Sequence, residues 1–178
     1  MVHMSDPNAN SSLDAISVVP MEVHDWPVVR AIYAQGIATG NATFEESAPE
    51  WGHWNAGHLL ACRLVARSAG NVLGWAALSP MSSRCVYAGV AEVSIYIAEH
   101  ARGRKIGTKL LRAVVDASER EGIWTLQAGI FRENAASIHL HENCGFTLLG
   151  IRKRPGRIGG RWRDVVLMER RSETVGID

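Results

Sequence analysis

The chain has 178 residues, of which 47% are hydrophobic and 21% are charged, and its formal net charge at pH 7 is +1. This length suits one domain with a sizeable core, and the composition is that of a soluble globular protein. No apolar run approaches the ~20 residues of a membrane span. The small net charge gives no general attraction to nucleic acid or membranes, so we expect neither as a partner.

The two ends of the chain and its cysteines set the expected domain bounds and compartment. Residues 1–14 are interpreted as a tag remnant and a disordered polar lead, in which we see no signal peptide. Residues 15–170 form the expected domain, and residues 171–178 a C-terminal tail. The cysteines are scattered without zinc or disulfide spacing, which favours a reducing, cytoplasmic location; they are Cys62, Cys85 and Cys144.

The first half of the chain predicts a strand, two helices and a pair of strands. Apolar residues recur at helical spacing between a cap at Asp25 and a stop at Gly40. A second helix is expected at 51–60, with strands at 15–20, 63–66 and 72–78 and a turn at 70–71. The loops at 41–49 and 79–89 carry Phe44 and Arg84 respectively.

The second half predicts four more strands and two more helices. The alternating stretch 90–97 predicts a strand with Glu92 on the more polar face. A helix that ends at Gly122, a strand at 124–131, a helix at 134–144 and strands at 147–152 and 162–168 complete the chain. We therefore expect an α/β, single-domain fold with a mixed central sheet of about seven strands flanked by about four helices. The strands on either side of the helix before Gly122 should run parallel.

The stretch 99–111 links a predicted strand to a predicted helix. It contains two glycines among three basic residues: Arg102, Gly103, Arg104, Lys105 and Gly107. Glycines let backbone N–H groups approach a ligand, and a helix N-terminus offers unpaired donors, so this stretch could hold a pyrophosphate. Its spacing is neither that of the P-loop nor that of the dinucleotide-binding glycine motif. A basic loop before a surface helix is the plain alternative.

Two motifs together resemble the GCN5-related N-acetyltransferase (GNAT) superfamily. Arg102 and Gly107 occupy the ends of its acyl-CoA loop Gln/Arg-x-x-Gly-x-Gly/Ala, although Lys105 replaces the middle glycine. The stretch 134–146 is similar to a second pattern, Asn-x-x-Ala/Ser-x-x-x-Tyr-x-x-x-Gly-Phe, with His141 at the tyrosine position. The resemblance covers about 16–169 and implies the α/β acetyltransferase fold with acetyl-CoA as co-substrate.

Within that superfamily the chain resembles the phosphinothricin N-acetyltransferases and related amino-acid acetyltransferases. Four segments carry the likeness: Thr43–Glu45, Ala91–Tyr96, Leu140–Glu142 and Arg161–Val166. The resemblance implies transfer of acetyl to the α-amine of phosphinothricin, methionine sulfoximine or arsinothricin, and a role in resistance. It also implies a homodimer. Its catalytic pair, a strand glutamate and a helix histidine, falls on Glu92 and His141.

The chemistry of that pair can be argued from the residues themselves. An α-amine with a pKa near ~8 is only partly neutral at pH 7, so a general base would assist its attack on a thioester. His141 titrates in the right range, whereas Glu92 needs a raised pKa or an intervening water. His141 could instead protonate the departing thiolate. As alternatives, Glu92 could be a structural partner of an arginine, and His141 a packed helix residue.

The resemblance also implies which residues hold acetyl-CoA, and a backbone N–H near Ile95 as the donor to the oxygen that gains charge. The expected cofactor-binding residues are Ile95, Tyr96, Ile97, Arg102, Gly103, Arg104, Lys105, Ile106, Gly107, Thr108, Asn134 and Ser137. No metal is expected, because His53 and His58 lie five apart and no His-Glu-x-x-His motif occurs.

The candidate acceptor-binding residues are Arg84 and Phe44. A guanidinium grips a carboxylate or phosphinate through two hydrogen bonds, so Arg84 could bind a small-molecule amine substrate by its acid group. It could equally be a solvated loop arginine, and Phe44 could simply belong to the core. The segment 152–163 holds six basic residues; its glycines favour a flexible turn over a nucleic-acid contact.

Three functions therefore remain open from sequence. The first is acetylation of a small amino acid or toxic analogue with a second acidic group. The second is acetylation of a protein or peptide amine. The third is an acetyl-CoA-binding module without turnover, against which Glu92 and His141 together argue, because binding alone requires neither.

Overall fold

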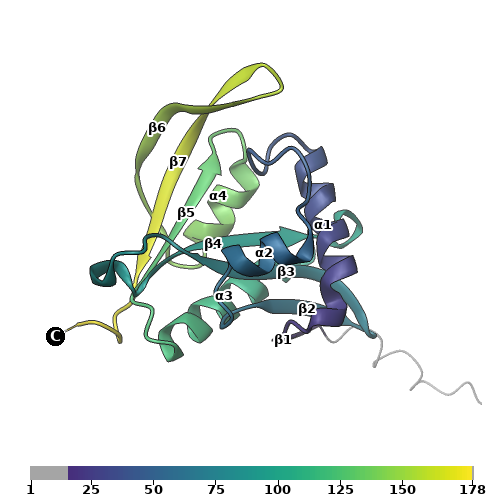
Figure 1. The fold of residues 1–178 in the computed structure, drawn as a ribbon, viewed down its shortest axis with the longest axis horizontal. Helices are drawn as coiled ribbons and strands as arrows, with labels where there is room; N and C mark the ends of the chain where they lie inside the picture. The colour runs from purple at the N-terminus through teal and green to yellow at the C-terminus, as the bar shows by residue number, and fades with distance from the viewer. Residues whose placement is uncertain (1–15, 178) are drawn as a thin grey trace, which may run out of the picture.

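A seven-stranded mixed sheet forms the centre of the protein (Figure 1). The structure is a computed structural model and describes residues 16–177. The predicted lead at 1–14 lies outside these described residues, as does Ala15. The strand order is β1-β2-β3-β4-β5-β7-β6, and every neighbouring pair is antiparallel except β4 and β5. The predicted α/β fold, with about seven strands and four α-helices in the described part, is confirmed.

The bounds of the elements follow the predicted order. The strands are β1 (Ser17–Pro20), β2 (Leu64–Ser68), β3 (Asn71–Pro80), β4 (Val90–Ile97), β5 (Thr125–Phe131), β6 (Thr147–Ile158) and β7 (Arg161–Arg171). The helices are α1 (Trp26–Ala38), α2 (Trp51–Gly57), α3 (Ile106–Arg120) and α4 (Ala135–Glu142), with short 3-10 turns at 23–25, 85–87 and 99–101.

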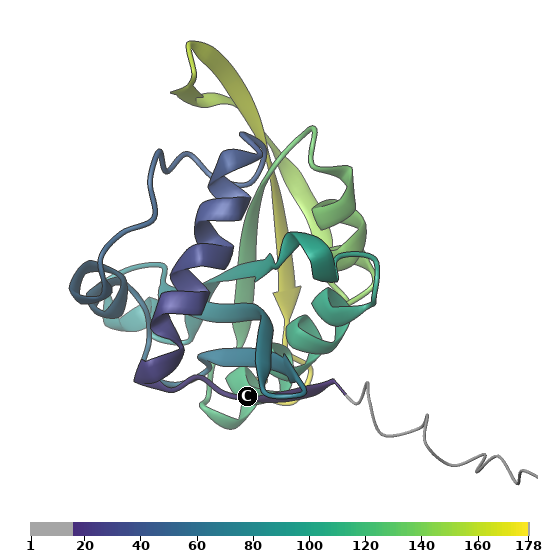
Figure 2. The ribbon, with the colours of Figure 1, turned by 90° about the vertical axis from the view of Figure 1, so that its right-hand side faces the viewer.

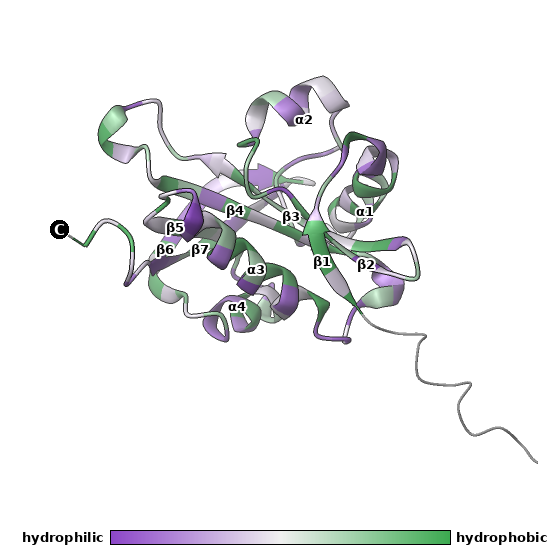
Figure 3. Cartoon of the chain, turned by 90° about the horizontal axis from the view of Figure 1, so that it is seen from below, coloured by the Kyte–Doolittle hydropathy of each residue, from purple (hydrophilic) through white to green (hydrophobic). Residues whose placement is uncertain are grey.

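Helices cover the sheet in two layers, α1 and α2 on one face and α3 and α4 on the other (Figure 3). The central strand β3 is buried throughout 72–78, and this explains its nearly continuous apolar sequence. On α3, Ile106, Leu110, Leu111 and Val114 form a fully buried stripe. The core therefore lies between the sheet and these two helical layers.

Two boundaries in the first half differ from the prediction. The second helix ends at Gly57 rather than at residue 60, because His58 is extended (φ −118°, ψ 146°) and Leu59 N–H donates to the Leu78 carbonyl. The turn between β2 and β3 lies at Ala69-Gly70, where both residues have positive φ (46° and 81°). Asn71 therefore belongs to β3.

The predicted flexible turn at 152–163 is wrong for most of its length. β6 and β7 pair through this segment and leave a two-residue turn at Gly159-Gly160, with φ of 53° and 78°. A bulge interrupts the pairing between Arg152 and Gly156. This hairpin projects beyond the rest of the molecule (Figure 2). The glycines therefore serve the turn and the packing of paired strands.

The C-terminal end is joined to the body of the domain. β7 continues to Arg171, one residue into the predicted tail, and Ser172 is buried. The Arg171 guanidinium donates to the carbonyls of Trp124 and Val175, and the Ser172 hydroxyl donates to Glu119. None of the helices within 16–177 is long and apolar enough to cross a membrane.

We predict that Gly36→Ala destabilises the fold by about 1–3 kcal/mol, because an added methyl must displace a packed ring. A Cβ at Gly36 would lie 2.5 Å from the Tyr96 ring, which stacks on Trp75 with centroids 4.9 Å apart. Denaturant unfolding measures the change. Gly52→Ala is the matched control, since its Cβ would meet nothing within 4 Å, and helix propensity predicts that it is neutral or slightly stabilising. Equal stabilities of the two variants would contradict the prediction.

Candidate active site

The cleft exists because β4 and β5 stay paired for only three residues. Their parallel register runs Val90↔Thr125, Ala91↔Leu126 and Glu92↔Gln127, and the strands then diverge. Two connected hollows result, with volumes of about 780 and 450 Å³. Both are lined by Ile95, Tyr96, Asn134 and Ser137, among others. The backbone groups of β4 beyond Glu92 therefore face a cleft instead of a neighbouring strand.

The smaller hollow lies between β4, the loop after it and the N-termini of α3 and α4. Of the predicted cofactor-binding residues, all but Arg104 line it: Ile95, Tyr96, Ile97, Arg102, Gly103, Lys105, Ile106, Gly107, Thr108, Asn134 and Ser137. A Cβ at Gly107 would lie 3.1 Å from Leu140, so this glycine lets α3 approach α4 closely. The roles of these residues toward a ligand stay predictions.

Lys105 caps α3 in a left-handed backbone conformation (φ 59°, ψ 16°). This region favours glycine, and an L-residue there costs roughly 1–2 kcal/mol. The conformation explains why the superfamily pattern has glycine at this position. Lys105 keeps the shape of the loop and adds a cation beside the helix N-terminus.

His141 lies on α4 and is 2% exposed. Its Nδ1 is 2.8 Å from the Ser137 carbonyl, which fixes the proton on Nδ1, while Nε2 has no hydrogen-bond partner among residues 16–177. Burial lowers the pKa of His141, and the Ser137 carbonyl offsets this only in part. The imidazole is therefore neutral near pH 7, with a free lone pair on Nε2. This state suits uptake of a proton before any donation.

Glu92 occupies the point where β4 and β5 separate. Burial between the strands raises the pKa of Glu92, and a hydrogen bond from Gly129 N–H opposes the rise. The Glu92 residue is nevertheless exposed by its accessible surface, so contact with water limits this rise. A raised pKa brings this carboxylate closer to the working range of a general base.

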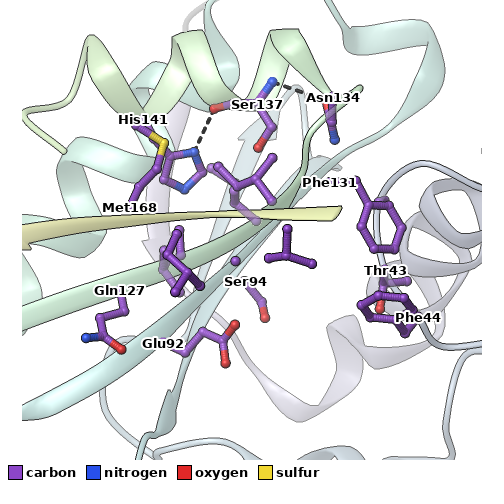
Figure 4. Close-up of a pocket in the computed structure, with 18 of the residues that line it drawn as sticks. Thr43, Phe44, Glu92, Ser94, Gln127, Phe131, Asn134, Ser137, His141 and Met168 are labelled. Carbon is purple, nitrogen blue, oxygen red and sulfur yellow. Dashed lines mark hydrogen bonds between the residues drawn. The ribbon is translucent and has the colours of Figure 1, made fainter. Parts of the chain in front are cut away.

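Glu92 and His141 reach the larger hollow from opposite sides of the strands (Figure 4). In this view His141 hangs from α4 above the strands, and Glu92 projects below them. The two side chains do not hydrogen-bond to each other, because His141 Nδ1 faces the Ser137 carbonyl and Nε2 has no partner within 16–177. They reach one cleft from different elements, and their catalytic roles stay predictions.

Asn134 caps α4 and has its side-chain groups already engaged. Its Oδ1 accepts from Ser137 N–H at 3.2 Å, and its Nδ2 donates to the Asn41 carbonyl at 3.0 Å. Asn134 thus joins the 41–49 loop to α4. Its predicted contact with the cofactor must accommodate both bonds.

Two aromatic rings line one side of the larger hollow. Phe44 lines it and packs edge-to-face on Phe131, with ring centroids 4.7 Å apart. A Cβ at Gly156 would lie 2.7 Å from Phe44, so only glycine there admits this ring. Phe44 therefore lines the predicted pocket and packs within it at the same time.

Arg84 does not line either hollow in this structure. Its guanidinium lies over the Tyr87 ring, 5.6 Å from the centroid, in the loop after β3. The arginines that line the larger hollow are Arg152 and Arg157 of β6. Arg157 Nε donates to the Gly160 carbonyl, whereas the Arg152 guanidinium has no hydrogen-bonding or ionic partner within 16–177. The role of Arg84 stays a prediction.

Sequence reasoning missed Gln127 and Arg152 as lining residues. Gln127 could have been found from its place opposite Glu92, once the two strands were predicted to be parallel neighbours. Arg152 could not, because the bulge in β6 decides which side chains face the cleft.

Fold and site together define a GNAT acetyltransferase, and the comparisons agree. The model of the acetyltransferase (GNAT) family matches residues 26–146, and the chain belongs to this family. The predictions of the superfamily and of an N-acetyltransferase are confirmed.

Individual relatives show which acetyltransferases the chain is similar to. The chain is 38% identical over 153 residues to the phosphinothricin N-acetyltransferase of Alcaligenes faecalis, covering 82% of this chain and 77% of that one. It is 29% identical to the L-methionine sulfoximine/L-methionine sulfone acetyltransferase of Pseudomonas aeruginosa, covering 83% and 89%. A solved phosphinothricin acetyltransferase from Sinorhizobium meliloti, in complex with acetyl-CoA, superposes with a TM-score of 0.79 at 29% identity, covering 92% and 96%.

We predict that Lys105→Gly stabilises the fold by about 1 kcal/mol, because it relieves the left-handed backbone. Lys105→Ala keeps the strain and should not. Both variants remove the cation and should weaken coenzyme A binding about 3- to 10-fold, which calorimetry would measure. A stabilised alanine variant, or unchanged binding in both variants, would contradict this account of Lys105.

Proposed function

We propose that this protein transfers acetyl from acetyl-CoA to the α-amine of a small amino acid with a second acidic or oxyanion group. Phosphinothricin, methionine sulfoximine and arsinothricin are acceptors of this type. The observation that carries the proposal is that Glu92 and His141 line one cleft from opposite sides of the splayed strands. The names of the Alcaligenes and Pseudomonas relatives support the acceptor class. Acetylation of a toxic analogue would confer resistance to it.

The smaller hollow fits acetyl-CoA by the chemistry of its lining. Backbone donors around Gly103 and Gly107, with Arg102 and Lys105 nearby, suit a pyrophosphate at the start of α3. The extended edge of β4 from Ile95 to Ile97 offers hydrogen-bonding groups to an amide-containing arm. When bound, acetyl-CoA supplies the acetyl group as an activated thioester.

The two protons released in the reaction go to different acceptors, and we assign one to Glu92 and one to His141. An acceptor that enters as an ammonium loses two protons as its nitrogen becomes an amide and the carbon–sulfur bond breaks. One proton goes to solvent, and the other ends on the sulfur. Glu92, on the acceptor side with a raised pKa, takes the first. Neutral His141 takes up the second on Nε2 before passing it to the thiolate.

We also propose a cytoplasmic homodimer. Leu148, Leu149 and Ile151 on the edge strand β6 and Trp162 on β7 are large apolar residues left exposed. An exposed apolar strip on an unpaired strand edge favours a second copy as its cover. The three free thiols suit a reducing compartment. Light scattering would test the dimer.

Release of coenzyme A thiol tests the activity directly. Acetyl-CoA would be supplied with phosphinothricin, methionine sulfoximine, ordinary amino acids and peptides. We predict turnover with the amino-acid analogues. Turnover with peptides alone would show that the acceptor is a peptide amine and not a small amino acid. No turnover with any amine would favour an acetyl-CoA-binding module without catalysis.

Glu92→Gln and His141→Ala should each lower kcat by about 10²-fold or more, while the Kd for coenzyme A changes little. In the parent enzyme kcat/KM should fall as pH drops through the raised pKa of Glu92, since the protonated carboxyl accepts no proton. That acidic limb should lie above the range of an ordinary glutamate and disappear in Glu92→Gln. Full turnover in both variants would remove these assignments.

Arg84→Ala should raise KM for the acidic acceptor by about tenfold with little change in kcat, because binding of the acid group is lost. Arg152→Ala is the matched comparison, since Arg152 lines the cleft without a partner. If only Arg152→Ala raises KM, then recognition of the anion belongs to β6 and the role of Arg84 is refuted.

A further inference from the structure

A row of polar residues crosses the sheet at the level of Glu92. The register aligns Glu92 with Gln127, Gln127 with Glu169, and Glu169 with Thr147. Side chains aligned in this way point to the same face of a sheet. Gln127 and Glu92 line the acceptor side of the cleft, whereas Glu169 lies behind Gln127 and does not line it. Ser79 of β3 is aligned with Glu92 on its other side, so the row continues past Glu92, and Glu92 and Gln127 are the members that line the cleft.

The amide of Gln127 has a fixed orientation. Its Nε2 donates to Glu169 Oε2 at 2.9 Å. A carboxylate can only accept, so the NH₂ end of the amide must face Glu169. The carbonyl oxygen then remains for the cleft, and in Figure 4 it lies on the side of Glu92. Two acceptor groups therefore lie at one register position on neighbouring strands and line the same cleft.

A single carboxylate provides too few hydrogen-bond acceptors to orient an attacking amine. An ammonium presents three N–H groups, and Glu92 already accepts from Gly129 N–H. Once the amine has lost a proton, its remaining N–H groups still need acceptors if the lone pair is to point at the acetyl carbon. A neutral carbonyl accepts from the charged and the neutral amine alike, so it does not hold the amine in its protonated form.

Resting on the proposed function, we infer that Gln127 Oε1 is a second acceptor for the substrate amine beside Glu92. Glu169 is then a positioning residue that acts only by orienting the Gln127 amide. The pair makes the site specific for primary amines, because a primary amine retains two N–H groups after deprotonation whereas a secondary amine retains one.

The test uses Gln127→Met, which keeps length and shape without an acceptor, together with Glu169→Met and the double variant. Binding of L-methionine sulfoximine to the coenzyme A complex would be measured by calorimetry, with KM and kcat alongside. We expect Gln127→Met to weaken acceptor binding and raise KM about tenfold, and Glu169→Met about threefold. The Kd for coenzyme A and the melting temperature report on folding and should change little.

The double variant decides whether Glu169 works through Gln127. We expect it to match Gln127→Met, because without the amide there is nothing left to orient. Independent, multiplied effects would refute the positioning role. Unchanged acceptor binding in Gln127→Met would refute the inference while parent turnover still supported the proposed function. Conversely, the unsubstituted protein could bind the acceptor through Gln127 without acetylating it. That result would refute the proposed function and leave the inference about Gln127 intact.

Discussion

The cleft, and with it the candidate active site, depends on the short pairing of β4 with β5. Two neighbouring parallel strands would ordinarily hydrogen-bond along their length, and each bond given up forfeits about 0.5–1.5 kcal/mol. Here pairing stops after Glu92↔Gln127. The Glu92 carboxylate lies close to Gly129 of β5, whose backbone N–H partly offsets the rise in the pKa of Glu92. The remaining edge of β4 lines the cleft, so the sheet gives up strand pairing where the cleft opens.

Burial sets the protonation of both candidate proton carriers in opposite senses. Removal from water disfavours charge, so it raises the pKa of Glu92 and lowers that of His141. Glu92 is thereby moved toward the neutral range, whereas His141 is moved below it and is neutral at pH 7. The same change of environment thus prepares two different side chains for one reaction.

The acceptor wall is held by contacts between distant parts of the chain. Buried Arg163 on β7 donates to the Gly40 carbonyl at 2.6 Å, to Asn41 Oδ1 at 2.7 Å and to Glu133 at 3.0 Å. These bonds tie the loop that carries Phe44 to the strand opposite it. A loop without regular structure is in this way given a fixed position over the cleft.

The elements and the candidate catalytic residues could be predicted from the sequence, because periodicity, caps, glycines and motifs are local properties. The strand at 90–97 and the helix after Lys105 could be predicted closely, and Glu92 and His141 could be identified from motif and residue type. Tertiary structure alone decided that these two meet from opposite sides of one cleft, that Arg84 lies away from it, and that Gln127 stands beside Glu92. Those facts depend on strand register, on the splay of β4 from β5 and on a bulge in β6, and each of these arises from contacts between segments far apart in the chain.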